Sequence, residues 1–151
     1  MTSDAKSWPM PPSVPPGMRV ELSRARLLPG AADETERWMA MLHERYPECL
    51  GTLPGEKMAL EATFRHTDAD GAEWLYHLSL YGEGGAQLDL DHPVNRDHVE
   101  FAKRCKEPGW EELRPVLLLM PQDVRSAAVR SAAVRAATGG SATGSCVEGD
   151  M

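Results

Sequence analysis

The sequence predicts one domain of the α+β class between residues 18 and 120. Two observations about patterning support this class. Several short stretches alternate apolar with polar residues, as strands do, and two longer stretches repeat apolar residues at helical spacing. A third observation places the domain, because this segment holds all 5 histidines and the whole net charge of −7, while the tails carry equal numbers of acidic and basic residues.

Three of the expected strands follow from alternation. The first covers residues 18–28, where Val20 and Leu22 alternate with polar residues and a Pro-Gly pair ends the run. Residues 56–66 and 73–81 form the next two strands, and the Asp- and Gly-rich stretch between them predicts a hairpin. The apolar faces of this hairpin consist of Met58, Leu60, Ala62 and Phe64 in one strand and Trp74, Tyr76, Leu78 and Leu80 in the other.

Two helices are expected between the strands. Asp33 stands three residues before Glu36 as a capping-box-like pair, which predicts a helix start, and an apolar stripe follows. Pro47, which lacks an amide hydrogen, should end or kink this helix. The second helix should begin with Asp91 as its cap and Pro93 in its first turn. Its apolar stripe contains Val94, His98, Phe101 and Cys105.

The last strand is expected at residues 115–120, a short unbroken apolar run between prolines that is typical of a strand covered on both faces. The resulting order is the ferredoxin-like βαββαβ arrangement, in which right-handed crossovers place both helices on one face of an antiparallel four-stranded sheet. The other face would keep apolar side chains such as Leu75 and Tyr81. A second copy of the same sheet is the economical cover, so we expect a homodimer.

The segments on either side of the domain have the composition of tails. Residues 1–17 hold 5 of the 12 prolines and predict a flexible, polyproline-like arm without the apolar stretch of a secretory signal. Residues 121–151 are rich in Ala, Gly and Ser and repeat the motif RSAAV, which predicts a partly helical, frayed tail. A lid or a subunit-exchanging arm is the functional alternative, and the Gly- and Ser-rich end predicts disorder.

Composition excludes several classes of protein. No apolar run approaches the roughly 18 residues of a membrane helix, and an acidic domain has no basic excess to neutralise nucleic-acid phosphates. The 3 cysteines are widely spaced and fit neither a disulfide framework nor a zinc motif, so a reducing cytoplasm is the simpler location. The sequence also lacks a phosphate-binding glycine loop, a serine-nucleophile elbow and a Cys pair, and we expect no cofactor.

The most distinctive stretches of the sequence are RARLLPG before the first helix, the hairpin around LEATFRH and WLYHLSLY, and DHPVNRDHVEFAKRC in the second helix. Together, over about residues 18–120, they resemble a bacterial domain-of-unknown-function family that belongs to the dimeric α/β-barrel proteins. The resemblance implies a ferredoxin-like fold and a dimer. That superfamily includes antibiotic-biosynthesis monooxygenases, polyketide cyclases, lactone isomerases, heme-handling enzymes and noncatalytic modules, so the resemblance favours the fold more than any one function.

The polar strand faces supply the candidate catalytic residues. If the apolar faces pack on the helices, the opposite faces gather ionisable residues in a pocket that a dimer would enclose. Proton transfer without a cofactor needs a base near neutral pKa and a donor for the developing oxyanion. His77 is the expected base, and Glu61 would orient it or act itself. Tyr81 or Arg65 would donate. A one-residue bulge would exchange His77 for Tyr76, and a hydrogen-bonded face without a ligand is the structural alternative.

Other polar and aromatic residues are candidates for substrate binding. Arg24, at the end of the first strand, is in reach of an acidic substrate or of surface carboxylates. His92 would cap the second helix or line the pocket mouth, and His98 is a core histidine or a ligand. These two histidines do not share a helix face, so we expect no metal site. The full set of expected binding residues is Arg24, Thr63, Arg65, Trp74, Tyr76, Ser79, His92 and His98.

We therefore expect a cofactor-independent small-molecule enzyme of the cyclase or isomerase type or a cofactor-free oxygenase. The resemblance to the superfamily, and not the sequence alone, implies its place in small-molecule metabolism, with secondary metabolism as one option. Its pocket would lie between sheet and helices or at the dimer interface, and it would use acid and base catalysis. The alternative is a noncatalytic ligand-binding or assembly module that uses the same sheet face. In both cases we expect a cytoplasmic protein without nucleic-acid or membrane partners.

Overall fold

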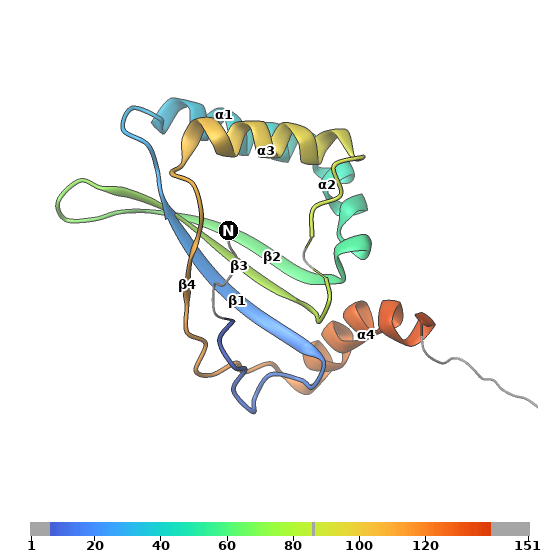
Figure 1. Ribbon diagram of the computed structural model, residues 1–151. Helices are drawn as coiled ribbons and strands as arrows, with labels where there is room; N and C mark the ends of the chain where they lie inside the picture. Colours follow the sequence, from blue (N-terminus) through green and yellow to red (C-terminus); the bar gives the residue numbers. More distant parts are fainter. Residues whose placement is uncertain (1–6, 86, 140–151) are drawn as a thin grey trace, which may run out of the picture.

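The computed structural model describes residues 7–85 and 87–139 and has an α+β fold (Figure 1). One antiparallel sheet contains the strands β1 (Met18–Arg26), β2 (Met58–Thr67), β3 (Glu73–Gly82) and β4 (Glu111–Leu113). The helices of the described residues are α1 (Ala32–Glu44), α2 (Tyr46–Thr52), α3 (Pro93–Cys105) and α4 (Gln122–Gly139), with a 3-10 turn η1 (Pro54–Glu56) before β2. None of these helices is long and apolar enough to cross a membrane.

The sheet has the strand order β2-β3-β1-β4, with the expected hairpin of β2 and β3 at one edge. Helices α1 and α3 lie side by side over one face of the sheet, and α2 continues from α1 (Figure 1). Helix α4 lies against the other face. This arrangement of one antiparallel sheet and two paired helices is compatible with the ferredoxin-like fold that the element order predicts.

The core between helices and sheet is built around Trp38 of α1. Its side chain is 2% exposed and belongs to one apolar cluster with Leu75 of β3 and Cys105 of α3, which Leu27 and Ala31 complete. Full burial of an apolar side chain contributes about 1.5–3 kcal/mol relative to exposure. The apolar stripes of α1 and α3 therefore meet the sheet at Leu75.

The helices cover the sheet face opposite to the one expected. Residues paired across strands share a face, and residues two apart along a strand do so as well, so Thr63 and His77 lie on the same side as the buried Leu75. On the other side, Leu60 and Phe64 are 47% and 55% exposed. The expectation that the apolar strand faces pack on the helices is therefore wrong. Alternation sorts residues into two faces, but only tertiary packing decides which face is inside.

A β-bulge near the start of β2 changes one side-chain direction. Met58 pairs with Tyr81, whereas Leu60 pairs with Leu80, so the register shifts between them. Met58 therefore lies on the helix-covered face and not with Leu60, as strict alternation predicts. The β1–β3 register is regular throughout, so no bulge in β3 displaces His77.

The last strand lies earlier in the chain than expected. Strand β4 pairs with β1 through residues 111–113, and residues 115–120 lie outside the ladder. In this run Val116, Leu117 and Leu119 are exposed, and the amide of Leu118 donates to Ser13 Oγ at 2.9 Å. Prolines at both ends of the run remove amide hydrogens that a ladder would use. Apolar content alone therefore predicted the strand at the wrong place.

The predicted start of α1 differs from the structure, whereas its predicted end is confirmed. The N-cap residue is Ala31, no side chain caps the helix, and Asp33 lies inside the first turn. The pair of Asp33 and Glu36 is therefore not a capping box. Pro47 falls in the first turn of α2, just after α1 ends, where its missing amide hydrogen costs no helical hydrogen bond.

Residues 7–17 and α4 cover one end of the second sheet face. Val14 is buried in a cluster with Leu80 of β3 and Ala132 of α4. The guanidinium of Arg125 donates to the Ser13 carbonyl at 2.9 Å. The composition of residues 1–17 indicates a mobile arm, but its described part is held by these contacts. The rest of that arm and the Gly- and Ser-rich end lie outside the described residues.

Candidate functional site

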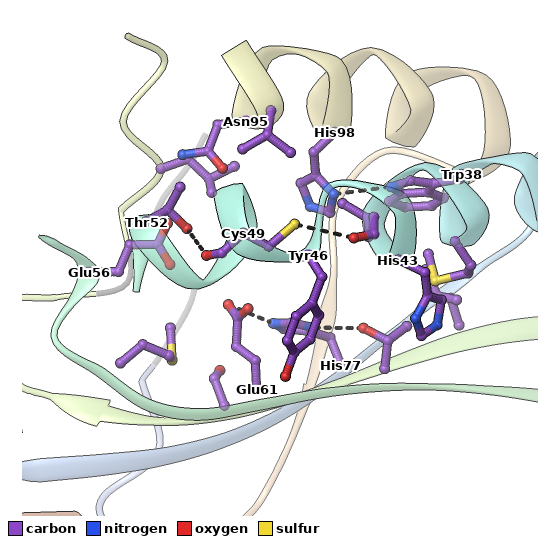
Figure 2. A pocket seen from close by; sticks show the side chains of 18 of the residues that line it. Trp38, His43, Tyr46, Cys49, Thr52, Glu56, Glu61, His77, Asn95 and His98 are labelled. Carbon is purple, nitrogen blue, oxygen red and sulfur yellow. Dashed lines mark hydrogen bonds and ion pairs between the residues drawn. The ribbon is translucent and has the colours of Figure 1, made fainter. Parts of the chain in front are cut away.

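A cavity of about 580 Å³ lies between the sheet and helices α1, α2 and α3 (Figure 2). This volume is within the range of small-molecule sites. The sheet contributes Glu21, Met58, Glu61, Thr63, Leu75, His77 and Ser79. The helices contribute Trp38, Met39, Leu42, His43, Tyr46, Cys49, Thr52, Val94, Asn95 and His98, and the connecting segments add Glu56, Leu88 and Trp110.

His77 of β3 lies beside two polar side chains of β2. Its Nε2 is 3.7 Å from Glu61 Oε2, and its Nδ1 is 3.4 Å from Thr63 Oγ1. Thr63 is the direct ladder partner of His77, and Glu61 lies two residues along the same face. The ring of Trp110, which precedes β4, is 6.0 Å from the imidazole between centroids. Burial lowers the pKa of His77, so the imidazole is neutral near pH 7 and able to accept a proton.

Two carboxyl groups of the cavity have surroundings that favour their protonated forms. Burial raises the pKa of Glu61. Glu56, at the end of η1, is 4% exposed, and its Oε2 has no hydrogen-bond partner among the described residues. Burial, together with the charge of Glu61, raises the pKa of Glu56 to about 7. The hydrogen bond with Thr52 only partly offsets this cost of a buried charge, so Glu56 exchanges a proton near neutral pH.

His98 of α3 lies on the helical wall of the cavity and has a defined tautomer. The indole N–H of Trp38 donates to His98 Nδ1 at 3.0 Å, so the neutral ring carries its proton on Nε2. Burial, and to a smaller extent the neighbouring His77, lowers the pKa of His98 to about 4. His98 is therefore a neutral hydrogen-bond donor at physiological pH and not a base.

Five of the predicted site residues line the cavity. They are Glu61, Thr63, Ser79, His77 and His98. Strand alternation accounts for the common face of the residues from β2 and β3. Their enclosure by the helices of the same chain follows from the packing at Leu75.

Two residues considered as donors lie outside the cavity. Tyr81 is buried further along the same sheet face beside Arg19, and burial raises the pKa of its hydroxyl. Arg65 forms ion pairs with Glu36 at 3.4 Å and with Glu73 at 2.7 Å. Neither side chain lines the space around His77.

The remaining predicted binding residues also lie outside the cavity. Arg24, Trp74 and Tyr76 are on the opposite sheet face. The guanidinium of Arg24 lies 4.0 Å from the Trp74 ring centre and donates to the Tyr76 hydroxyl at 3.3 Å. His92 is the N-cap residue of α3, in the position expected for Asp91, and makes no side-chain cap hydrogen bond.

Three aromatic residues and one carboxyl belong to the cavity although they were not predicted. Trp38 and Tyr46 come from α1 and α2, and Trp110 precedes β4. The apolar stripe around Trp38 was a usable signal that this side chain faces the sheet. No sequence pattern marks Trp110 or Glu56, because each reaches the cavity only through the fold.

The described residues do not favour cysteine or metal chemistry at this site. Cys49 Sγ is 3.7 Å from the carbonyl oxygen of Leu42, and burial raises the pKa of its thiol, which disfavours a thiolate nucleophile. Cys105 is part of the apolar core. Within residues 7–85 and 87–139, no group of three or more His, Cys, Asp or Glu side chains could hold a metal ion.

The part of the chain that forms the sheet and the cavity also defines its family. Searches of curated proteins and of solved structures found no match. One family model, described as "Family of unknown function (DUF6176)", matches residues 18–126. This range agrees with the expected resemblance to a domain-of-unknown-function family. It covers most of the chain, which therefore belongs to the DUF6176 family.

Proposed function

We propose that this protein is a cofactor-independent enzyme that moves a proton on a small molecule bound in the cavity. The observation that carries the proposal is the pairing of His77 with Glu61, an imidazole and a carboxyl 3.7 Å apart in a cavity of ligand size. Titratable groups with shifted pKa values in a cleft are typical of catalytic sites. The reaction class is enolisation followed by isomerisation or ring closure.

The two histidines have complementary roles in this reaction. The neutral His77 accepts a proton from a C–H group next to a carbonyl, and Glu61 stabilises the imidazolium that forms. His98 Nε2–H donates a hydrogen bond to the carbonyl oxygen on which negative charge develops. In an isomerisation, His77 then returns the proton to another carbon of the substrate. In a ring closure, the enolate carbon attacks an electrophilic carbonyl of the same molecule, and the imidazolium protonates the alkoxide.

Exchange of protons with the solvent tests this proposal and does not require that the substrate be identified first. The protein is incubated with a metabolite extract in D₂O, and mass spectrometry identifies the compounds that gain deuterium. We expect at least one such compound, and His77→Ala should slow its labelling about 100-fold or more. His66→Ala is the matched control, because His66 is exposed on the opposite sheet face. Unchanged labelling by His77→Ala would eliminate His77 as the base, and binding without labelling would favour the noncatalytic ligand-binding module.

We further propose a homodimer of the dimeric α/β-barrel type, formed through the second sheet face. Leu60 and Phe64 are half-exposed on this face although α4 covers part of it. Apolar patches of this kind mark interaction surfaces. The free thiols of Cys49 and Cys105 also suit the reducing cytoplasm proposed as the location.

Light scattering at micromolar concentration tests the dimer. The wild-type chain should have twice the monomer mass, and Phe64→Asp should return it to the monomer. A monomeric wild-type chain would contradict the dimer but not the chemistry, because the cavity lies on the other face of the sheet.

A further inference from the structure

The acidic and basic residues that line the cavity are all of one sign. Glu21, Glu56 and Glu61 contribute carboxyl groups, and no Lys or Arg among the described residues lines it. Among the basic residues near the lining, Lys57 donates to a backbone carbonyl at 3.2 Å and Arg45 forms two surface ion pairs. The ammonium of Lys106, 4.6 Å from the ring centre of Trp110, donates to the carbonyls of Glu107 and Gly109. When these carboxyl groups are ionised, the cavity attracts cations and repels anions.

The carboxyl of Glu56 is hydrogen-bonded to Thr52, but one of its oxygens has no partner among the described residues. Its buried Oε2 accepts no hydrogen bond in the described structure, and Figure 2 shows the side chain beside Thr52 on the cavity wall. The loop that contains Gly85 lies closely against its backbone. A Cβ at Gly85 would stand 2.3 Å from the Glu56 carbonyl oxygen, so only glycine allows that loop to lie against η1. A buried carboxyl at the cavity wall with one unpaired oxygen can accept a hydrogen bond from a bound donor.

The other walls of the cavity are apolar and aromatic. Trp38, Tyr46 and Trp110 supply aromatic rings, and Leu42 and Val94 supply aliphatic surface. Organic cations are attracted by aromatic rings, and their hydrocarbon parts gain free energy on burial. The walls therefore match a ligand with an apolar body and a charged end.

We infer that the cavity binds a small organic amine in its cationic form, with the ammonium group at Glu56 and Glu61 and an apolar or aromatic body among the helices. This inference rests on the proposed function, for which it names the substrate class: an amine that also contains a carbonyl group with a neighbouring C–H. A neutral ligand without a donor would leave Glu56 Oε2 unpaired, and an anion would face three carboxyl groups. An ammonium group has two or three N–H donors and can satisfy both Glu56 and Glu61.

The affinity for such a cation should depend on pH through Glu56. Since its pKa is about 7 in the empty cavity, a bound cation must displace a proton below that pH. The wild-type affinity should therefore rise about tenfold between pH 6 and pH 8. Two groups act on the carboxyl of Glu56 besides burial: the charge of Glu61 raises its pKa, and the hydrogen bond with Thr52 lowers it. Asn95, His77 and His98 line the same cavity, and the Lys57 ammonium is held by the Glu83 carbonyl.

Three fragments of matched shape test the inference on the full chain. 2-Phenylethylamine, 2-phenylethanol and 3-phenylpropionate share a phenyl ring and differ in charge. Binding is followed at pH 8 through the indole N–H resonances of Trp38 and Trp110, which line the cavity. We expect the amine to bind at least about tenfold more tightly than the alcohol, and the propionate to bind most weakly.

Two variants and a control assign the charge preference to the named carboxyls. Glu56→Gln should reduce amine affinity to the level of the alcohol and abolish its pH dependence. Glu61→Gln should reduce amine affinity and move its pH dependence to lower pH, because the charge of Glu61 helps to raise the pKa of Glu56. Glu100→Gln, on the exposed surface of α3, should leave both unchanged.

Several outcomes would overturn the inference. They are equal binding of the three fragments, preference for the propionate, no amine binding up to about 20 mM, or an amine preference that survives both cavity variants. Binding is measured without turnover, so failure of the deuterium-labelling test would leave this result intact. Failure of the charge preference would likewise leave the proton-transfer proposal standing.

Discussion

The two faces of the sheet are built in opposite ways. One lies beneath α1, α2 and α3, and the other is partly covered by α4. The first carries Glu61, Thr63 and His77 and borders a cavity, whereas the second carries the half-exposed Leu60 and Phe64. The polar face is nevertheless the one beneath the helices. Its apolar contact is concentrated in the cluster around Leu75 and Trp38, and the polar residues further along the same strands border the space beside that contact.

The comparison shows that a face can be covered without being packed. A tight apolar contact at one end holds the helices in position, and the polar end then provides titratable groups that border the cavity. This division explains why the pKa values of His77 and His98 are lowered while those of Glu56 and Glu61 are raised, since burial opposes the charged form of each group.

Leu75→Ala should have the largest effect, because it removes the contact that selects the covered face. We expect a loss of about 2–5 kcal/mol in the free energy of unfolding, the range for buried leucine truncations. Leu60→Ala, on the half-exposed face, should cost less than about 1 kcal/mol. Urea unfolding followed by circular dichroism measures both. Equal losses would show that the two faces are packed alike.

His98→Asn tests whether burial under the helices lowers the pKa of the His98 imidazole. The folded pKa of His98, about 4, lies below the unfolded value of 6.5, so the unfolded chain binds more protons between these limits and folding is favoured as the pH rises. The difference in free energy of unfolding between wild type and variant should grow by about 3 kcal/mol from pH 4 to pH 7. A difference independent of pH, measured by urea unfolding at both values, would contradict the burial of this imidazole.

Glu56→Gln should show a pH dependence of opposite sign and slightly smaller size. The folded pKa of about 7 exceeds the unfolded value of 4.5, so the stability due to the protonated carboxyl is present at low pH and is lost as the pH rises through 7. The stability of wild type relative to the variant should therefore fall by about 2–3 kcal/mol from pH 5 to pH 8. Urea unfolding of wild type and variant at both pH values measures this fall. A stability of wild type relative to the variant that rose with pH would contradict the raised pKa of Glu56.

Gly82→Ala should have the smallest effect and concerns the second face. A Cβ there would stand 3.2 Å from the Cβ of Ala132, so α4 must shift slightly on β3. We expect a loss of about 1 kcal/mol by thermal or urea unfolding. Gly51→Ala in α2 is the control, because nothing lies within 4 Å of the new methyl group and helix propensity favours alanine. Stabilisation by Gly82→Ala would mean that α4 does not dock on this face.

The sequence was sufficient for the element order and for much of the candidate site. Alternation in residues 73–81 placed Ser79 and His77 on one face, and the turn chemistry between the hairpin strands placed Thr63 and Glu61 beside them. Pro47 marked the break between α1 and α2. These features depend on backbone geometry within a few residues, where local sequence has the strongest influence.

Other parts of the site depend on contacts between distant segments. Glu56 is buried because the loop containing Gly85 lies against it, and Trp110 meets His77 only once the chain before β4 reaches the sheet. The apolar run at 115–120 matches a strand in composition, yet residues 111–113 pair with β1. Pairing depends on available amides and on a free sheet edge, which composition does not encode.

By itself, the sequence determined which residues share a face of each strand, because the pleat of a strand alternates side chains with a period of two. Only the tertiary structure decided which face the helices cover. Both faces contain enough apolar surface to be buried. Which face α1 and α3 cover depends on the packing of Trp38 in α1 against Leu75 in β3, two residues that are far apart in the sequence. Because the helices cover the polar face, its side chains line a cavity.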